Sequence, residues 1–477
     1  MSDRALVRDL FLRLLGVVFV VAFLSLLAQV TVLVGEHGLL PAREYLRTAQ
    51  GFLDAPTVFW LGCGDGTLRA GAVLGALLGV GLACGIAPRW CLAALWALYL
   101  SYVTIGQEFL SFQWDNLLLE SALLALFVAP GGIRPRAPAA PHPLAVFLML
   151  WLVFRLHVES GAAKLLLGDP TWRDLTAMVT YYETAPLATW VGWYAHQMPL
   201  WAHKVCGFYM YVVELGLPLL MWGPAPARAV TFVGMLVMQI GVILTGNYGF
   251  FNYLSIALLL FVLDDRQVAR VLGRLARTRA DTTPRPASPV LLVGAPLLVA
   301  LSVLQFAPFL TPSRRLDPLL FRVQRVLDTY RSVNAYHLFA HMTLVRREAV
   351  IEGSADGATW QPYEFRYKPG DVDRPPPFVA PHQPRVDFQL WFLLLGGRPG
   401  ARYFDTLLQR LLTEPATFQP LFARDPFPDA PPQLVRVAIY RYRFTDARTR
   451  RATGAWWRRD LEGYSRALDA DRFRSRP

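Results

Sequence analysis

The sequence is poor in charged residues and in cysteine. Asp, Glu, Lys and Arg make up 17% of the 477 residues, below the roughly 25% that is usual for soluble domains. The cysteines are few and form neither a CxxC pair nor a disulfide framework: Cys63, Cys84, Cys91 and Cys206. These shortages favour a membrane protein over a soluble or disulfide-stabilised one, and we predict no metal centre.

The familiar motifs of catalysis are also missing. The chain has no HExxH, no GxSxG, no phosphate-binding loop and no GxGxxG. His157, His196 and His203 lack the spacing of metal ligands relative to any carboxylate or cysteine. We therefore expect no cofactor, and any catalysis would need residues outside these signatures.

What the sequence does have is long apolar runs in its first two thirds. Hydrophobic residues reach 54%, and nine runs are candidate membrane spans because about 20 apolar residues cross a bilayer as a helix. The runs cover residues 10–34, 70–87, 91–105, 117–128, 143–161, 205–222, 227–244, 250–263 and 289–310. Two of them, 117–128 and 250–263, are short enough to be partial spans. We predict a polytopic α-helical membrane domain at 1–311, with the first run retained, and a soluble domain at 312–477.

The formal net charge of +12 is concentrated in loops beside the apolar runs. With the N-terminus inside, alternate connections carry the basic residues, as the positive-inside rule requires: Arg4, Arg8 and Arg13; Arg89; Arg134 and Arg136; Arg228; and Arg266, Arg270, Arg274, Arg277, Arg279 and Arg285. This pattern explains the charge by membrane topology, and we predict no nucleic-acid partner. The remaining connections and the soluble domain then share the periplasmic or lumenal side.

The last third of the chain has the pattern of an α+β domain rich in β-strand. Residues 343–351 and 359–367 read as strands joined by the Asp356-Gly357 hairpin turn, and 434–444 is the clearest strand in the chain. Residues 386–395 and 403–412 have helical periodicity.

Ionisable residues gather at the end of the run that begins at residue 143. The end of that segment carries Arg155, His157, Glu159 and Lys164. Placing ionisable side chains near a bilayer costs free energy unless they are paired or have a function. One interpretation is a self-contained Arg155–Glu159 pair at i, i+4, with Lys164 reaching toward the membrane surface. The other is a functional Lys164 that acts as a base, because burial favours the neutral amine.

A second polar insertion, at 111–120, offers partners for these groups. Asp115 or Asn116 could cap the helix that follows, while Glu120 pairs with a neighbour. Alternatively, the two insertions form one buried polar cluster of Asp115, Asn116, Glu120, Arg155 and Glu159. Glu214, inside another run, also needs a partner that the sequence does not identify, and the connection at 245–252 is expected to be structural.

Several of these stretches together resemble the lipase maturation factor family. They are FQWDNLLLE (112–120), RLHVESGAAKLLLGDPTWRDLTAMVTYYET (155–184), WYAHQMP (193–199), LTGNYGFFN (244–252), EGSADGATWQPYEFRYKPGD (352–371) and RPPPFVAPHQPRVDFQLWF (374–392). The resemblance implies a non-enzymatic membrane factor that helps client proteins, lipases in the family, to fold and assemble. It also implies that the C-terminal domain engages clients, and we assign that contact to Trp360, Tyr363, Phe365 and Tyr367.

The same resemblance bears on location. Eukaryotic family members are endoplasmic-reticulum membrane proteins, whereas the Ala/Arg/Pro-rich composition here is typical of bacteria. The implied location is then the inner (plasma) membrane, with the soluble domain on the periplasmic side. The expected partners are client proteins and membrane lipid.

A fainter similarity provides the alternative function. Residues 160–165, SGAAKL, resemble the segment of vitamin K-dependent γ-carboxylases that holds their lysine base. Those enzymes also join a multi-span membrane domain to a largely β lumenal domain. On this analogy the chain would be a membrane enzyme that uses Lys164 as a base on a lipid or quinone.

Overall fold

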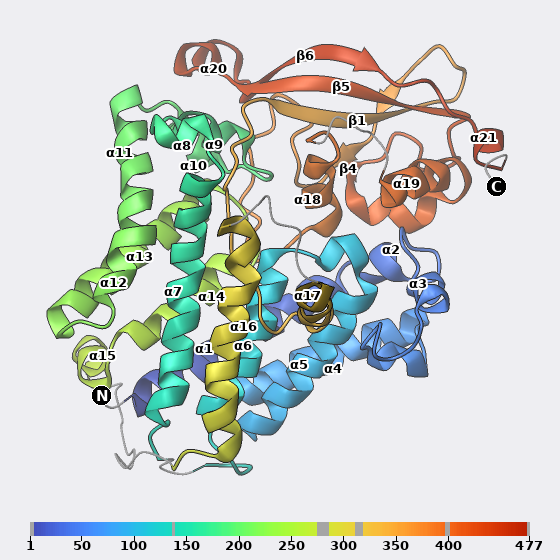
Figure 1. Cartoon of the computed structure of the whole chain (residues 1–477). Helices are drawn as coiled ribbons and strands as arrows, with labels where there is room; N and C mark the ends of the chain where they lie inside the picture. The colour runs from blue at the N-terminus through green and yellow to red at the C-terminus, as the bar shows by residue number, and fades with distance from the viewer. Residues whose placement is uncertain (1–3, 136–138, 274–285, 311–317, 396–400, 475–477) are drawn as a thin grey trace.

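A computed structural model describes residues 4–135, 139–273, 286–310, 318–395 and 401–474. It stacks a layer of long helices against a smaller domain built around a β-sheet, with α18 and α19 between the sheet and the helices (Figure 1). The predicted domain boundary at residue 311 lies outside the described residues, as do Arg136, Arg274, Arg277, Arg279 and Arg285 of the basic connections.

All nine predicted apolar segments contain helix. The long helices are α1 (Ala5–Leu27), α4 (Asp65–Ala83), α5 (Pro88–Ile105), α6 (Gln113–Val128), α7 (Pro143–Leu166), α11 (Leu200–Tyr211), α13 (Ala225–Thr245), α14 (Phe251–Leu259) and α16 (Pro289–Leu310). Among the described residues, five helices are long and apolar enough to cross a membrane: α1, α4, α7, α13 and α16. The predicted count of nine spans is therefore not confirmed.

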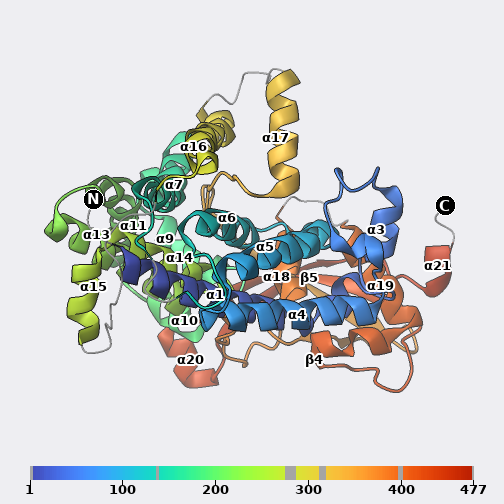
Figure 2. The same cartoon turned by 90° about the horizontal axis from the view of Figure 1, so that it is seen from below.

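Further helices connect and flank these. They are α2 (Val30–Val34), α3 (Ala42–Thr48), α8 (Pro170–Arg173), α9 (Ala177–Thr184), α10 (Trp190–His196), α12 (Leu217–Leu220), α15 (Asp265–Leu272) and α17 (Pro318–Tyr330). A π-helical turn, Val212–Gly216, joins α11 to α12. Helix α17 lies across α16: Figure 1 views α17 along its axis and α16 from the side, and Figure 2 reverses the two.

The basic connections lie at the end of the helical layer opposite the sheet, where the N-terminus and α15 are found (Figure 1). Their arginines bind carbonyl groups at helix ends. Arg4 donates to Phe261 O and Leu263 O at 3.1 and 3.0 Å, and Arg89 donates to Ala129 O at 2.9 Å. A cation at a helix C-terminus also opposes the negative end of the helix dipole. The division into a basic end and a sheet end is the arrangement that the arginine pattern predicts.

The main sheet has four antiparallel strands in the order β2-β1-β5-β6. They are β1 (Arg346–Ser354), β2 (Gln361–Pro362), β5 (Leu434–Phe444) and β6 (Trp457–Tyr464), and β3 (Glu364–Phe365) pairs with β4 (Phe422–Arg424) in a second, small sheet. The predicted strand at 434–444 is confirmed as β5, and the one at 343–351 begins later, as β1. The single strand predicted at 359–367 is wrong, because the segment divides into two pieces: Gln361–Pro362 pairs with β1 in the main sheet, and Glu364–Phe365 pairs with β4 in the second sheet.

Both helices predicted in this domain are present. Helix α18 (Arg385–Phe392) and helix α19 (Arg402–Thr413) begin one residue before their predicted positions. The apolar face of α19 is buried, with Phe404, Leu407 and Leu411 among its contacts to the core. The two remaining helices, α20 (Ala447–Thr453) and α21 (Ala470–Arg474), flank β6 in the chain.

Candidate binding site at the junction of the two domains

A buried ion pair joins the membrane domain to the soluble domain. Asp115 in the first turn of α6 is 0% exposed and binds Arg385 of α18 through both carboxylate oxygens, at 2.6 and 2.8 Å. Tyr99 O–H donates to the same carboxylate at 2.6 Å, and Arg385 also donates to Phe109 O at 3.1 Å. Asp115 therefore does not join the predicted cluster around Arg155. Neither Asp115 nor Asn116 caps α6, because the residue before its first turn is Phe112.

The connection at 245–252 also belongs to this domain interface. The Asn247 side chain accepts from Val379 N and Ala380 N at 2.7 and 3.0 Å and donates to Pro377 O at 2.9 Å. The amide thus satisfies three backbone groups of a proline-rich loop that has few partners of its own. The structural role predicted for this connection agrees with the geometry.

A buried arginine makes the third contact across the interface. Arg346, the first residue of β1, donates to the carbonyl of Glu183 in the last turn of α9 and to those of Ala185 and Pro186 just after it. Its guanidinium also pairs with Glu348 at 2.6 Å. A cation at a helix C-terminus is favourable, and here the helix and the cation come from different domains.

Two titratable groups at the interface have shifted pKa values. Burial, and next the nearby charge of Arg385, lowers the pKa of His382. Its Nδ1 lies 2.9 Å from Ser25 Oγ of α1. Burial raises the pKa of Glu183, although the hydrogen bond from Phe444 N and the charge of Arg346 oppose that shift.

Glu120, Arg155 and Glu159 do form a buried cluster, as predicted. Arg155 of α7 is hydrogen-bonded to Glu120 of α6 and lies 3.7 Å from Glu159. Asn116 is only partly buried and accepts from Arg331 at 3.2 Å, at the margin of the cluster.

The sequence did not reveal the third component of this cluster, residues 331–345, which we call the crossing segment. It runs from α17 to β1 over the ends of α6 and α7. Tyr336 donates its O–H to Glu120 Oε2 and its N–H to Glu159 Oε2, both at 2.8 Å. Asn334 donates to Glu120 at 3.0 Å and accepts from Arg155 at 2.7 Å. Asn334 and Tyr336 are two of several polar residues in this irregular segment, and no local pattern distinguishes them from the others.

Replacing Tyr336 by Phe tests the role of the crossing segment. The change leaves one buried carboxylate oxygen without the O–H donor and is expected to cost about 1.5–3 kcal/mol of unfolding free energy, as hydrogen bonds to charged groups do. Denaturation in detergent measures the effect, with Tyr464→Phe as control because its ring is half exposed. Equal stability of the two variants would contradict the assignment.

Lys164 is bound to Glu214, the buried carboxylate for which the sequence identifies no partner. Lys164 is 1% exposed, and its Nζ lies 2.8 Å from both Glu214 oxygens and 3.0 Å from Leu338 O of the crossing segment. The π-helical turn at 212–216 aims Glu214 at α7; such turns often occur at functional sites. The interpretation in which Lys164 reaches toward the membrane surface is wrong. The Lys164 Nζ thus has three acceptors within 3.0 Å and a fourth, Ser160 O, at 3.4 Å, so its hydrogen bonds are made within the protein.

His157 has a structural position. Its ring is buried and Nδ1 lies 2.8 Å from Val153 O, one turn earlier in α7. Among the described residues, no group of three or more His, Cys, Asp and Glu side chains is placed to hold a metal ion.

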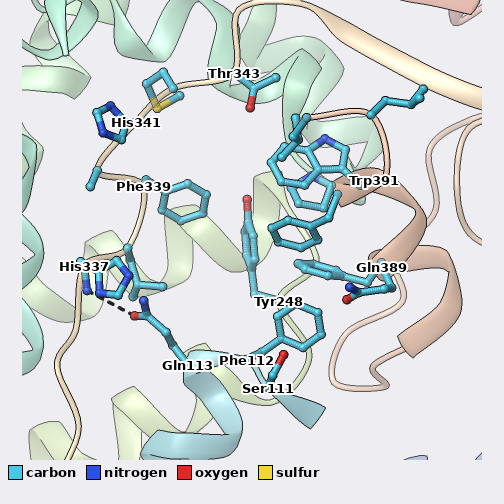
Figure 3. Close-up of a pocket in the computed structure, with 18 of the residues that line it drawn as sticks. Ser111, Phe112, Gln113, Tyr248, His337, Phe339, His341, Thr343, Gln389 and Trp391 are labelled. Atoms are coloured by element: carbon cyan, nitrogen blue, oxygen red, sulfur yellow. Dashed lines mark hydrogen bonds between the residues drawn. The ribbon is translucent and has the colours of Figure 1, made fainter. Parts of the chain in front are cut away.

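An apolar cleft opens beside these polar contacts, and we call it the domain cleft. Its volume is about 910 Å³. Phe112 and Trp114 of α6, the crossing segment with Phe339, Tyr248, and Phe388, Trp391 and Phe392 of α18 form its walls. Figure 3 shows Tyr248 in the middle, with Phe339 on one side and Trp391 on the other. Trp114 and Phe388 pack edge to face with their centroids 4.9 Å apart, and Phe112 stacks on Trp114 at 4.5 Å.

The residues predicted to contact clients lie elsewhere. Tyr363 and Phe365 are 2% and 3% exposed and pack on Phe422 inside the soluble domain. Trp360 keeps some exposure beside the Arg436 guanidinium, which lies 4.1 Å from its ring centroid, and Tyr367 is half-buried. None of the four lines the domain cleft. Only Trp360 and Tyr367 of this set present surface to a partner.

Comparisons with known proteins cover both domains. A family model described as "Lipase maturation factor transmembrane domain" matches residues 6–270, and one described as "Lipase maturation factor C-terminal domain" matches residues 332–466. The second match begins at the crossing segment. No solved structure matches the chain.

Curated relatives match over nearly the whole chain. "Lipase maturation factor 2" of Gallus gallus is 33% identical, covering 95% of this chain and 80% of the relative. The Homo sapiens protein of the same name is 33% identical over 96% of this chain and 82% of its own length. "Lipase maturation factor 1" of Bos taurus is 32% identical, with 96% and 90% covered.

Proposed function

We propose that this integral membrane protein, which belongs to the lipase maturation factor family, assists lipases to fold and assemble at the membrane surface. Its clients are incompletely folded lipase chains. It acts at the end of the molecule that carries the sheet, which is the periplasmic side of the inner membrane or, in eukaryotic relatives, the lumenal side of the endoplasmic reticulum.

The observation that supports this proposal is the domain cleft. A folded monomer rarely leaves a large apolar surface uncovered, and where it does the surface usually binds something. Phe392 and Leu344 in the cleft are 40% and 57% exposed. An apolar segment of an unfolded client gains free energy by covering such side chains, and it leaves when the client buries the same segment in its own core. The client can then bind to the cleft and leave it without an input of chemical energy.

The domain interface gives the cleft a fixed shape. The Asp115–Arg385 pair lies beneath the wall formed by α6 and α18, and the crossing segment is tied to Glu120, Glu159 and Lys164. A rigid, preformed surface loses little entropy when it binds. Trp360 and Tyr367 provide a second, smaller contact on the soluble domain.

The alternative of a membrane enzyme that uses Lys164 as a base is less favoured. A base must reach the proton that it removes, whereas the Lys164 ammonium is engaged by Glu214 and Leu338 O.

Charging the cleft is expected to abolish client maturation. In the Phe392→Asp, Leu344→Asp double variant, two exposed apolar contacts become anions. The affinity for an apolar segment should fall at least about tenfold, since burying each such side chain contributes about 1.5–3 kcal/mol. The measurement is the yield of active lipase from cells that lack their own maturation factor and express this chain, together with client recovered on the purified protein.

Leu461→Asp is the matched control for this experiment. Leu461 of β6 is 47% exposed, similar to Phe392, and does not line the cleft. The control should mature lipase like the native chain. If the double variant folds and also matures lipase at the native level, the cleft is not the client site.

A further inference from the structure

A second cavity lies within the helical layer, and we call it the inner cavity. Its volume is about 310 Å³, and it is bounded by α7, α9, α11, α13 and α14. This volume is at the lower limit of pockets that bind small molecules, roughly 300–1,000 Å³. Its position among apolar helices distinguishes it from the domain cleft, which faces the soluble domain.

The walls of the inner cavity suit a hydrocarbon. Rings and thioethers form most of them, including Trp172, Phe251, Met178, Met210 and Met238. Methionine side chains are flexible and polarisable, so they adapt to chains of varied shape.

The polar groups in the walls mainly bind one another. Lys164 pairs with Glu214, Asn252 donates to Gln239 at 2.7 Å, and the hydroxyls of Tyr181 and Tyr248 are 3.2 Å apart. Among the described side chains that line the cavity, the Trp114 indole N–H is buried without an acceptor. The walls therefore offer almost nothing to a charged ligand, whose desolvation would not be compensated.

The inner cavity reaches the lipid-facing surface between α11 and α13. Val237 and Gly241 of α13 line the cavity and are also exposed, Val237 at 52%. A Cβ atom placed on Gly241 would meet no atom within 4 Å. The outer faces of both helices carry exposed apolar side chains, among them Val205, Phe208, Val233 and Ile240, as expected for contact with hydrocarbon. The medium at this opening is the bilayer interior.

We propose that the inner cavity binds one acyl chain of a membrane phospholipid, which enters sideways between α11 and α13 and leaves its headgroup outside. This inference goes beyond client maturation. Trp114, Tyr248, Leu338 and Phe339 line both the inner cavity and the domain cleft. A bound acyl chain would therefore pack against these four residues on the side opposite the domain cleft. It would support the surface to which a client binds.

Photocrosslinking in nanodiscs tests the proposal without any client. The purified full-length protein is reconstituted in phosphatidylcholine doped with a phospholipid that carries a diazirine in one acyl chain. Labelled peptides are expected from the facing residues of α11, α13 and α14. In Gly241→Trp the indole fills the opening, and labelling of these peptides should fall at least tenfold. Val237→Trp is a second variant of the same opening.

Gly294→Trp is the matched control. Gly294 lies in α16, its Cβ would likewise meet no atom within 4 Å, and it does not line the inner cavity. Its labelling should equal that of the native protein. Equal labelling of all four proteins, or labelling by a diazirine fatty acid but not by the phospholipid, would overturn the proposal. Because lipase yield is not measured, failure here leaves the client-binding proposal standing.

Discussion

Asp115→Ala is expected to lower the free energy of unfolding by about 3–5 kcal/mol, the usual cost of removing one partner from a buried ion pair. The carboxylate is wholly buried, and Arg385 has 1% exposure. Without Asp115, the guanidinium stays in the interface with Phe109 O as its remaining acceptor and no compensating charge. Denaturation in detergent micelles measures the loss, and limited proteolysis reports whether the soluble domain loosens from the helices.

Two controls make this prediction specific. Glu44→Ala removes one partner of the Arg402–Glu44 pair, which joins the same two domains at 2.6 Å but is more than half exposed. Its cost should stay at or below about 1 kcal/mol, because water screens exposed pairs. The double variant Asp115→Leu, Arg385→Met removes both buried charges and should be much less unstable than the sum of the single variants. Additive losses would show that the two residues do not act as a pair.

The distance between partners along the chain explains what the sequence could and could not predict. The helices and β5 were predictable because their apolar periodicity is local. Asp115 and Arg385 are 270 positions apart, and Tyr336 and Glu120 are 216 apart. The periodicity of apolar residues within one segment does not indicate which distant residue that segment contacts. The sequence predicts that Glu214 needs a partner. The π-helical turn that directs it toward Lys164 has no recognisable signature in the residues around Glu214.

The candidate site was hard to predict for a related reason. Tyr363, Phe365 and Tyr367 alternate like one apolar face of a strand, and an apolar face that looks free in sequence can be buried by folding. Pairing of β3 with β4 buries Phe365 against Phe422. The domain cleft instead takes its walls from α6, Tyr248, the crossing segment and α18. Each contributes one to three aromatic residues, and none of these residues stands out in its own stretch of sequence.

Lys164→Met is expected to destabilise the protein by about 3–5 kcal/mol, since it leaves Glu214 buried without its cation. Adding Glu214→Leu removes the second charge, and the double variant should recover most of the lost stability. Lys164 comes from α7 and Glu214 from the π-helical turn, and both side chains are nearly fully buried, so apolar replacements of similar size suit their surroundings. Unfolding in detergent and the yield of active lipase are measured on the same three proteins.

The double variant distinguishes a structural ion pair from a catalytic base. If the pair only orients α7, the π-helical turn and the crossing segment, restoring the fold restores client maturation, because the domain cleft keeps its shape. We expect lipase yield at no less than about half the native level, which corresponds to less than 0.5 kcal/mol in any binding step. A double variant that folds and inserts like the native protein but matures no lipase would require the Lys164 amine itself. Maturation would then depend on proton transfer inside the membrane domain, and the enzyme alternative would replace the client-binding proposal.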